Sequence, residues 1–316
     1  MKRRAYLLLF LLLAGALYSC ARNEEAGPIT HLAFSGPLIS ARTTMVTAWE
    51  FPKNPLSDST LDESRLSNDI RWGFRLFTNT PIEAPQFVPG KISCSNCHLN
   101  AGQRERALPL IGVAAMFPEY NRRSGRLYTL NDRIVDCFFR SQNATGVAGG
   151  IQSKAQISLP HQTSKEVLAL AAYITWLARG YEVGQSLAWR GQNAIAEKNR
   201  IAVEKLDRKR GEALFMERCV NCHGEDGQGV AIGEKKAGPL WGPDSWNDGA
   251  GAARIYTLAG MIRYMMPYTA PGTLTDEEAQ QIAAFINSKA RPVFPFKEQD
   301  YISEKLPADS VYYPKR

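Results

Sequence analysis

Residues 94–98 read Cys-Ser-Asn-Cys-His, and residues 219–223 read Cys-Val-Asn-Cys-His. A Cys-X-X-Cys-His box is typical of covalent haem c attachment, because the two thiols add to the haem vinyl groups and the adjacent imidazole can bind the iron. One such box could be a zinc or redox motif beside a chance histidine. Two boxes in a chain with four histidines predict two haem c groups, attached through Cys94, Cys97 and His98 and through Cys219, Cys222 and His223.

The N-terminus has the pattern of a bacterial export signal. Three basic residues at positions 2–4 precede an apolar run over residues 6–17, which is shorter than the roughly 20 residues that a membrane-spanning helix needs. Residues 17–20 read Leu-Tyr-Ser-Cys, similar to the lipobox of bacterial lipoproteins. We expect residues 1–19 to be removed and Cys20 to carry lipid. The alternatives are an uncleaved anchor or a conventional signal peptide, and all three place the mature protein in the periplasm or at the cell surface.

Each haem iron needs a second axial ligand, and this ligand sets its chemistry. Met265 and Met266 follow His223 by 42 and 43 residues and precede a proline. Methionine followed by proline is the usual distal-loop form in monohaem cytochromes c, so we favour Met266 over Met265. Two core methionines are the alternative reading, since methionine commonly fills gaps in cores.

The first haem has no methionine at that distance, because Met116 lies only 18 residues after His98. Cys137 lies 39 residues after His98 and is the one cysteine left when lipid and haem attachment have used the other five. We therefore expect Cys137 to be a thiolate ligand of the first iron, with a buried free cysteine as the alternative. The remaining histidines, His31 and His161, are poor ligand candidates.

An internal repeat organises the chain. Residues 73–77 read Gly-Phe-Arg-Leu-Phe and residues 211–215 read Gly-Glu-Ala-Leu-Phe, each upstream of a haem box. After each box comes a helix signal, a Thr-X-X-Glu capping box followed by an apolar face. The first expected helix has the capping box Thr163/Glu166, ends at Gly180 and has an apolar face of Val167, Leu170, Ala171, Ile174 and Leu177. The second has the capping box Thr275/Glu278, ends at Pro292 and has an apolar face of Ala279, Ile282, Ala283 and Ile286.

This repeated unit resembles the class I cytochrome c fold, in which the first and last helices cross through a small glycine and an aromatic residue. We expect an all-α protein with two such domains in tandem. The expected division is a signal peptide (1–19), an extended arm (20–44), a first domain with the active-site haem (45–182), a linker (183–204), a second domain with the electron-transfer haem (205–292) and an extended tail (293–316).

The composition agrees with a globular protein, with 44% apolar residues and a net charge of +7. Removing residues 1–19 takes away three basic residues, so 35 Lys and Arg against 31 Asp and Glu leave +4. This mild excess, without a basic run, does not indicate nucleic acid. It is compatible with small anionic substrates or an acidic partner.

Longer stretches resemble one family, the dihaem thiosulfate dehydrogenases, which also act as tetrathionate reductases. The resemblance covers about residues 77–295. It is carried by residues 77–81 (Phe-Thr-Asn-Thr-Pro), 94–99 (Cys-Ser-Asn-Cys-His-Leu), 133–143 (Arg-Ile-Val-Asp-Cys-Phe-Phe-Arg-Ser-Gln-Asn), 239–245 (Pro-Leu-Trp-Gly-Pro-Asp-Ser) and 284–288 (Ala-Phe-Ile-Asn-Ser).

The resemblance implies His98/Cys137 ligation at the active-site haem and His223/Met266 ligation at the electron-exit haem. It also implies that Arg123, Arg133 and Ser141 bind anions beside the first haem, with ordinary surface arginines as the alternative. Two guanidinium groups could bring two repelling dianions together. Gln103, Arg104 and Arg106 are weaker candidates for this anion site.

One position departs from the family pattern. Some members place a lysine before the distal methionine, where it can serve as an alternative ligand, whereas this chain has Met265. Lys235 and Lys236 lie well upstream, so we expect no exchange between lysine and methionine. A fixed His/Met haem would have a higher potential and suit the oxidising direction.

The leading prediction is an enzyme that couples two thiosulfates to tetrathionate and passes two electrons through its haems. The acceptor would be a small cytochrome c or a membrane oxidase, and the lipid on Cys20 would tether the enzyme to a membrane. One alternative is a non-catalytic dihaem electron carrier, which would normally have methionine at both irons. Another is a thiosulfate-handling cytochrome of a multicomponent sulfur oxidation system, which would need partner proteins.

Overall fold

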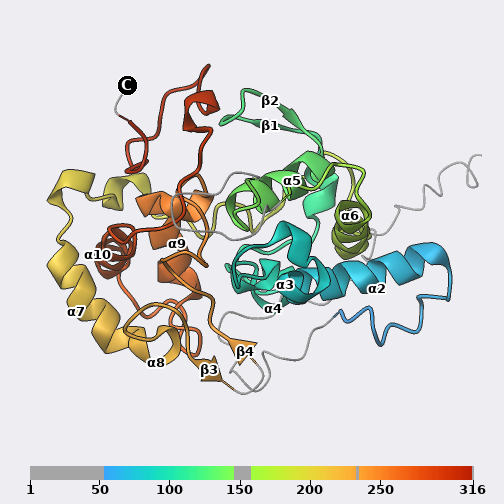
Figure 1. Cartoon of the computed structure of the whole chain (residues 1–316), viewed down its shortest axis with the longest axis horizontal. Helices are drawn as coiled ribbons and strands as arrows, with labels where there is room; N and C mark the ends of the chain where they lie inside the picture. Colours follow the sequence, from blue (N-terminus) through green and yellow to red (C-terminus); the bar gives the residue numbers. More distant parts are fainter. Residues whose placement is uncertain (1–52, 146–157, 233–234, 315–316) are drawn as a thin grey trace, which may run out of the picture.

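The computed structural model describes residues 53–145, 158–232 and 235–314. The predicted signal peptide, Cys20, His31 and the arm of residues 20–44 lie outside the described residues. Two groups of helices lie side by side, with the first group in blue to green and the second in yellow to red (Figure 1). Within the described part of the chain no helix is long and apolar enough to cross a membrane.

The predicted all-α class is confirmed. The first group contains α2 (Arg65–Thr78), α3 (Thr80–Glu83), α4 (Leu99–Gly102), α5 (Leu130–Arg140) and α6 (Lys165–Leu177). The second contains α7 (Arg208–Arg218), α8 (Val220–His223), α9 (Ile255–Met265) and α10 (Asp276–Ile286). Short 3-10 helices are η2 (Pro85–Phe87), η3 (Cys94–Asn96), η4 (Val113–Met116), η5 (Glu197–Asn199), η6 (Val203–Lys205), η7 (Gly251–Ala253) and η8 (Lys297–Gln299).

Two small antiparallel sheets are added to this helical frame, and the sequence pattern did not predict them. β1 (Glu119–Asn121) pairs with β2 (Arg126–Tyr128), with Glu119 opposite Tyr128. β3 (Ala231–Ile232) pairs with β4 (Lys235–Lys236). Strands of two or three residues are too short for an alternating apolar pattern to reveal them.

The two halves of the chain repeat one helix crossing. In the first half α2 crosses α6, and a Cβ at Gly73 would overlap the backbone carbonyl of Ala169. In the second half α7 crosses α10, and a Cβ at Gly211 would overlap the carbonyl of Gln281. Only glycine permits backbones to approach this closely, which explains why it stands at the head of both Gly-X-X-Leu-Phe repeats.

The closing helices bury the predicted faces. In α6 the predicted aliphatic residues are buried, with Ala171 partly buried, and in α10 all four predicted residues are buried. The Thr275/Glu278 capping box is confirmed, since each side chain bonds the other residue's backbone N–H. The prediction of a Thr163/Glu166 capping box is wrong. There Ser164 is the N-cap residue, Thr163 bonds the ring of His161, and Glu166 accepts a hydrogen bond from Gln86.

The segments outside the helix groups are packed against them. Between α6 and α7, the Trp189 indole donates to the Ile111 carbonyl in the first group, and Ile195 is buried in the second core. The tail from residue 293 passes the β1–β2 hairpin (Figure 1), where the Tyr301 N–H donates to the Arg123 carbonyl at 2.7 Å. It then returns to the second group, where Asp309 pairs with Arg254 at 3.0 Å.

Candidate functional site: two haem attachment sites and an anion site

The first haem box forms a short 3-10 turn with a fixed start. The Ser93 N–H donates to the Asn96 side chain at 2.7 Å, and the Cys94 N–H donates to the Thr80 hydroxyl at 3.1 Å. These bonds fix the start of the short turn that carries both cysteines and His98, the residues that would attach one haem.

The His98 imidazole is oriented by the backbone. Its Nδ1 lies 2.6 Å from the Leu108 carbonyl oxygen, and because a carbonyl only accepts, Nδ1 carries the proton and Nε2 has a free lone pair. Burial lowers the pKa of His98 to about 4, although the Leu108 carbonyl acts against this shift. The neutral ring is the form that binds a metal, and its second nitrogen has the support typical of ligating histidines.

Burial also keeps the attachment thiols protonated. It raises the pKa of Cys94 to about 12 and the pKa of Cys97 to about 11, and the nearby Cys137 contributes to both shifts. Burial likewise raises the pKa of Cys219 in the second box to about 12.

Cys137 lies on α5, which faces the first haem box. The helix starts at a capping box of Thr129 and Asp132, with bonds of 2.9 and 3.1 Å between each side chain and the other's backbone. At its far end the Gln142 amide nitrogen approaches Cys94 Sγ at 4.0 Å. Charge on Cys137 raises the pKa of both attachment cysteines, so the three thiols are close enough to interact electrostatically.

Three arginines act electrostatically on the Cys137 thiol. Burial raises the pKa of this thiol, whereas Arg133, Arg123 and Arg140 lower it in that order. Conversely, Cys137 is the main reason why the pKa of Arg133 is raised. The positive charges favour the thiolate that an iron ligand needs, but burial and the Asp136 carboxylate outweigh them, so the pKa of the free Cys137 thiol is raised.

Arg140 belongs to a buried ion-pair network. It bonds Asp136 at 2.7 Å, one turn earlier on α5, and the tail residue Asp300 at 2.7 and 2.8 Å. Tyr313 donates a further hydrogen bond to Asp300. Burial acts to lower the pKa of Arg140, but the two carboxylates outweigh it and raise that pKa. Since Arg140 is neutralised in this way, the other two arginines that act on Cys137, Arg133 and Arg123, are the candidates for binding an anion.

The three predicted anion-binding residues lie on α5, directly after it, and in the β1–β2 turn. Arg133 is one turn before Cys137, half exposed, and bonds Asp136 at 3.2 Å. Arg123 lies in the β1–β2 turn and donates to the Gly249 carbonyl of the second half at 2.9 Å. Ser141 follows α5, and its N–H donates to the Cys137 carbonyl at 2.8 Å.

The weaker anion-site candidates are engaged elsewhere. The Gln103 amide exchanges two hydrogen bonds with the Lys53 backbone, and Arg104 is completely buried against Tyr268. Arg106 lies with its guanidinium carbon 5.7 Å from the Tyr264 ring. We therefore do not retain these three residues in the anion site.

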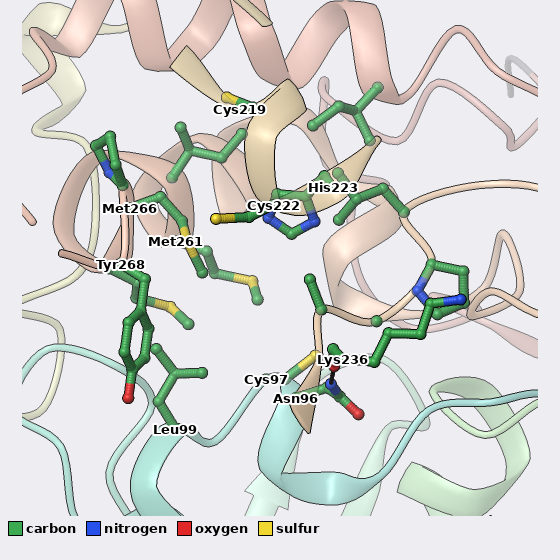
Figure 2. A pocket seen from close by; sticks show the side chains of 18 of the residues that line it. Asn96, Cys97, Leu99, Cys219, Cys222, His223, Lys236, Met261, Met266 and Tyr268 are labelled. Carbon is green, nitrogen blue, oxygen red and sulfur yellow. Dashed lines mark hydrogen bonds between the residues drawn. The ribbon is translucent and has the colours of Figure 1, made fainter. Parts of the chain in front are cut away.

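The second haem box lines a cavity of about 430 Å³. Figure 2 shows Cys222 and His223 facing this space together with Met261 and Met266, while Cys97 and Leu99 of the first half lie along its other side. Burial lowers the pKa of His223 to about 4. The Gly238 carbonyl beside Nδ1 acts against this shift, but the two atoms do not form a hydrogen bond of good geometry.

Three methionines, not two, line this cavity. Met261 lies one turn before Met265 on the same face of α9. The Met-Pro pattern in the sequence does not reveal it. Met265 is the last residue of α9 and packs with Leu99 and Ala107 of the first half. Met266 is the first residue beyond the helix and has an extended backbone.

Lys236 also lines the cavity, although it is remote from the methionines in sequence (Figure 2). It precedes Gly238, whose carbonyl faces His223, and its own carbonyl accepts a hydrogen bond of 3.4 Å from Asn96. The absence of an exchange between this lysine and Met266 stays a prediction.

These features fit haem at both boxes. Each holds two cysteines and a neutral histidine on one short segment, and each has a sulfur residue on another helix or loop nearby. The cavity of the second box is mainly apolar, with Leu258, Ile262, Ile282 and Ile286 among its lining residues. An apolar cavity with a histidine nitrogen and methionine thioethers in its lining suits a low-spin haem.

Comparison with known families agrees with this reading of the two halves. Residues 86–183 match the family described as SoxA/TsdA, cytochrome c domain. Residues 207–286 match the family described as cytochrome c oxidase, cbb3-type, subunit III. The chain is therefore a c-type cytochrome with two cytochrome c domains in tandem and two covalently bound haem c groups.

Whole-chain relatives define the family more narrowly. The thiosulfate dehydrogenase of Allochromatium vinosum is 38% identical over 240 residues, which cover 74% of this chain and 82% of that protein. The thiosulfate dehydrogenase of Stutzerimonas stutzeri is 32% identical, over 76% of this chain and 73% of that protein. The chain belongs to the thiosulfate dehydrogenase family.

A solved structure supports the same assignment. The thiosulfate dehydrogenase TsdBA of Marichromatium purpuratum, in its as-isolated form, superposes with a TM-score of 0.66 at 33% identity. The match covers 76% of this chain and 50% of that chain.

Proposed function

We propose that this protein is a thiosulfate dehydrogenase. It joins two thiosulfate dianions through a new sulfur–sulfur bond to give one tetrathionate dianion, and two electrons leave through the haems. Charge and atoms balance, because four negative charges enter and two remain on the product while two electrons depart. The observation that carries the proposal is Cys137, a partly buried cysteine near the first haem box whose thiol is influenced by the charges of Arg133 and Arg123.

In this proposal Arg133 and Arg123 bind the two substrates. Two dianions a few ångströms apart repel by on the order of several kcal/mol, even at an effective dielectric near 20. Arg133 is half exposed and so accessible to an anion, while Asp136 and the Cys137 thiolate hold its charge in place. The Ser141 hydroxyl adds a neutral hydrogen bond at the end of α5.

His98 and Cys137 would hold the first haem, and His223 and Met266 the second. When bound, the haems accept the electrons and pass them onward. A thiolate ligand lowers the potential of its iron, whereas a methionine ligand raises it. A lower potential at the first haem than at the second favours electron flow from the first domain to the second. This direction corresponds to thiosulfate oxidation.

The N-terminus supports a proposal about where the enzyme acts. We propose that it is exported and tethered to a membrane through lipid on Cys20. Its electrons would pass to a small cytochrome c or a membrane oxidase.

A purified-protein assay tests the function. Wild-type protein alone should reduce ferricyanide with thiosulfate and oxidise reduced viologen with tetrathionate. Cys137→Ser should lose nearly all turnover, and should lose a low-spin His/thiolate signal in electron paramagnetic resonance. Both haems should stay attached, because the thioether bonds do not involve Cys137. An unchanged spectrum in this variant would refute the ligand assignment.

The same assay separates a second function. The family of the first domain is described by two names, SoxA and TsdA, so a cytochrome of a multicomponent sulfur oxidation system is the alternative. Such a protein should be inactive with thiosulfate alone and active only with its partner proteins. A non-catalytic electron carrier should be inactive in both conditions.

A further inference from the structure

The segment that follows the first haem box has an unusual backbone. Four of its non-glycine residues have positive φ angles, namely Asn100 (53°), Ala101 (55°), Arg106 (58°) and Leu108 (50°). Such conformations are costly for residues with a Cβ and persist only where surrounding contacts impose them. This segment, residues 98–108, also supplies the Leu108 carbonyl that orients His98.

The contacts that hold this segment come in part from the second domain. Arg104 is completely buried, its Nη2 donates to the Tyr268 carbonyl at 2.8 Å, and its guanidinium carbon lies 4.3 Å from the Tyr268 ring. The Tyr268 hydroxyl donates to the Asn100 side chain at 3.3 Å. Leu99 and Ala107 pack with Met265.

Tyr268 is two residues after Met266, with Pro267 between them. Because proline restricts the backbone, fixing the Tyr268 carbonyl also fixes the place from which Met266 reaches the cavity. The planar guanidinium is suited to this task, since it can donate to a carbonyl while it stacks on an aromatic ring.

We propose that Arg104 is a positioning residue for the distal methionine of the second haem, supplied by the first domain. One segment then sets ligands at both irons: the Leu108 carbonyl orients His98, and Arg104 holds the loop that presents Met266. The inference rests on the proposed His223/Met266 ligation and adds a residue that acts on it from the other domain.

The test uses the full-length dihaem protein. Arg104→Gln should lose most of the weak far-red sulfur-to-iron absorption band of a His/Met haem, and the midpoint potential of that haem should fall. Haem content and the His/thiolate signal of the first haem should be retained. Arg104→Lys should recover part of the band, because it restores a donor to the Tyr268 carbonyl without the planar stack.

Two further variants keep the result interpretable. Arg106→Gln is the matched control, since Arg106 is on the same segment and contacts Tyr264 rather than Tyr268, and it should keep the band. Tyr268→Leu removes the stacked ring at a partly exposed position and should weaken the band even if Arg104→Gln does not fold.

The outcomes separate this inference from the one on which it rests. A wild-type protein without the far-red band would overturn Met266 ligation itself. A wild-type band that both Arg104→Gln and Tyr268→Leu retain, at an unchanged potential, would overturn the role of Arg104 alone.

Discussion

Met265 and Met266 are adjacent in sequence but have different surroundings. Met265 packs with Leu99 and Ala107 between the domains, whereas Met266 lies beyond the end of α9. We expect Met266→Ala to remove the far-red sulfur-to-iron band and Met265→Ala to retain it while lowering stability by about 2–5 kcal/mol, as for other buried methionines. Absorption spectra and thermal unfolding of the two variants measure both effects. The opposite spectral result would move the ligand to Met265.

Arg133 and Arg123 should matter for substrate rather than for haem. Removing one guanidinium from a charge-assisted contact costs about 1.5–3 kcal/mol, or roughly ten- to hundredfold in turnover. We expect this loss of thiosulfate oxidation in Arg133→Gln and Arg123→Gln with unchanged haem spectra, and a smaller loss in Ser141→Ala. The exposed neighbour Arg122 provides the control Arg122→Gln. Wild-type kinetics in both arginine variants across a range of ionic strengths would contradict the anion site.

Lys53 gives stability a pH dependence. Burial lowers the pKa of this amine to about 6, and the charge of Arg179 acts in the same direction. Between about pH 6 and its ordinary pKa near 10.5, the unfolded chain binds more protons at Lys53, so stability should rise with pH. We expect Lys53→Met to unfold at a higher temperature than wild type at pH 7, with a gap that narrows toward pH 10. A gap of constant size, or the same gap in the exposed Lys205→Met, would argue against this explanation.

At the scale of the helix, the two glycine crossings give a paired prediction. An alanine at Gly73 or Gly211 would overlap backbone rather than a movable side chain, so the helices must separate. We expect Gly73→Ala and Gly211→Ala each to cost about 1–3 kcal/mol, measured by thermal unfolding. Gly251→Ala is the control, because a Cβ there meets open space. If all three variants unfolded alike, the crossings would not explain why glycine is present.

The helices that close each domain could be predicted because their signals are local. The apolar spacing of α6 and α10 is a property of consecutive residues, and so is the Thr275/Glu278 cap. The Thr163 cap failed because Ser164, one residue later, competes for the same position. The β1–β2 hairpin was missed because strands of three residues are too short to show an alternating pattern. Met261 was missed because it is not followed by proline.

The contacts between the domains could not be predicted, because they join residues far apart in sequence. Arg104 was identified only as a weak anion ligand, and its partner Tyr268 is 164 residues away. Asp300 is 160 residues from Arg140. No local pattern specifies such pairs, whereas Cys137 could be proposed as a ligand because its distance from His98 is close to that of Met266 from His223 in the repeat.

At the scale of the whole molecule, the tail contacts the first domain as well as the second. Asp300 accepts two hydrogen bonds from the buried Arg140, and breaking a buried pair by removing one partner costs about 3–5 kcal/mol. We expect Asp300→Ala to lower the free energy of unfolding by about 3 kcal/mol. The value lies at the low end of the range because Asp136 still pairs with Arg140. Glu304→Ala, at a surface carboxylate 3.3 Å from the Tyr120 hydroxyl, should have little effect. Equal midpoints for the two variants would show that the Asp300–Arg140 pair adds nothing measurable to stability.

The order of synthesis gives this tail a further consequence. A chain is made from its N-terminus, and domains generally fold in that order. Both haem boxes and α5 are therefore complete before Asp300 and Tyr313, which close the network around Arg140, have been added. A product that terminated shortly before residue 300 would carry every cofactor-attachment residue and still leave Arg140 without its tail carboxylate. Completion of the chain thus acts as the last step in building the environment of Cys137.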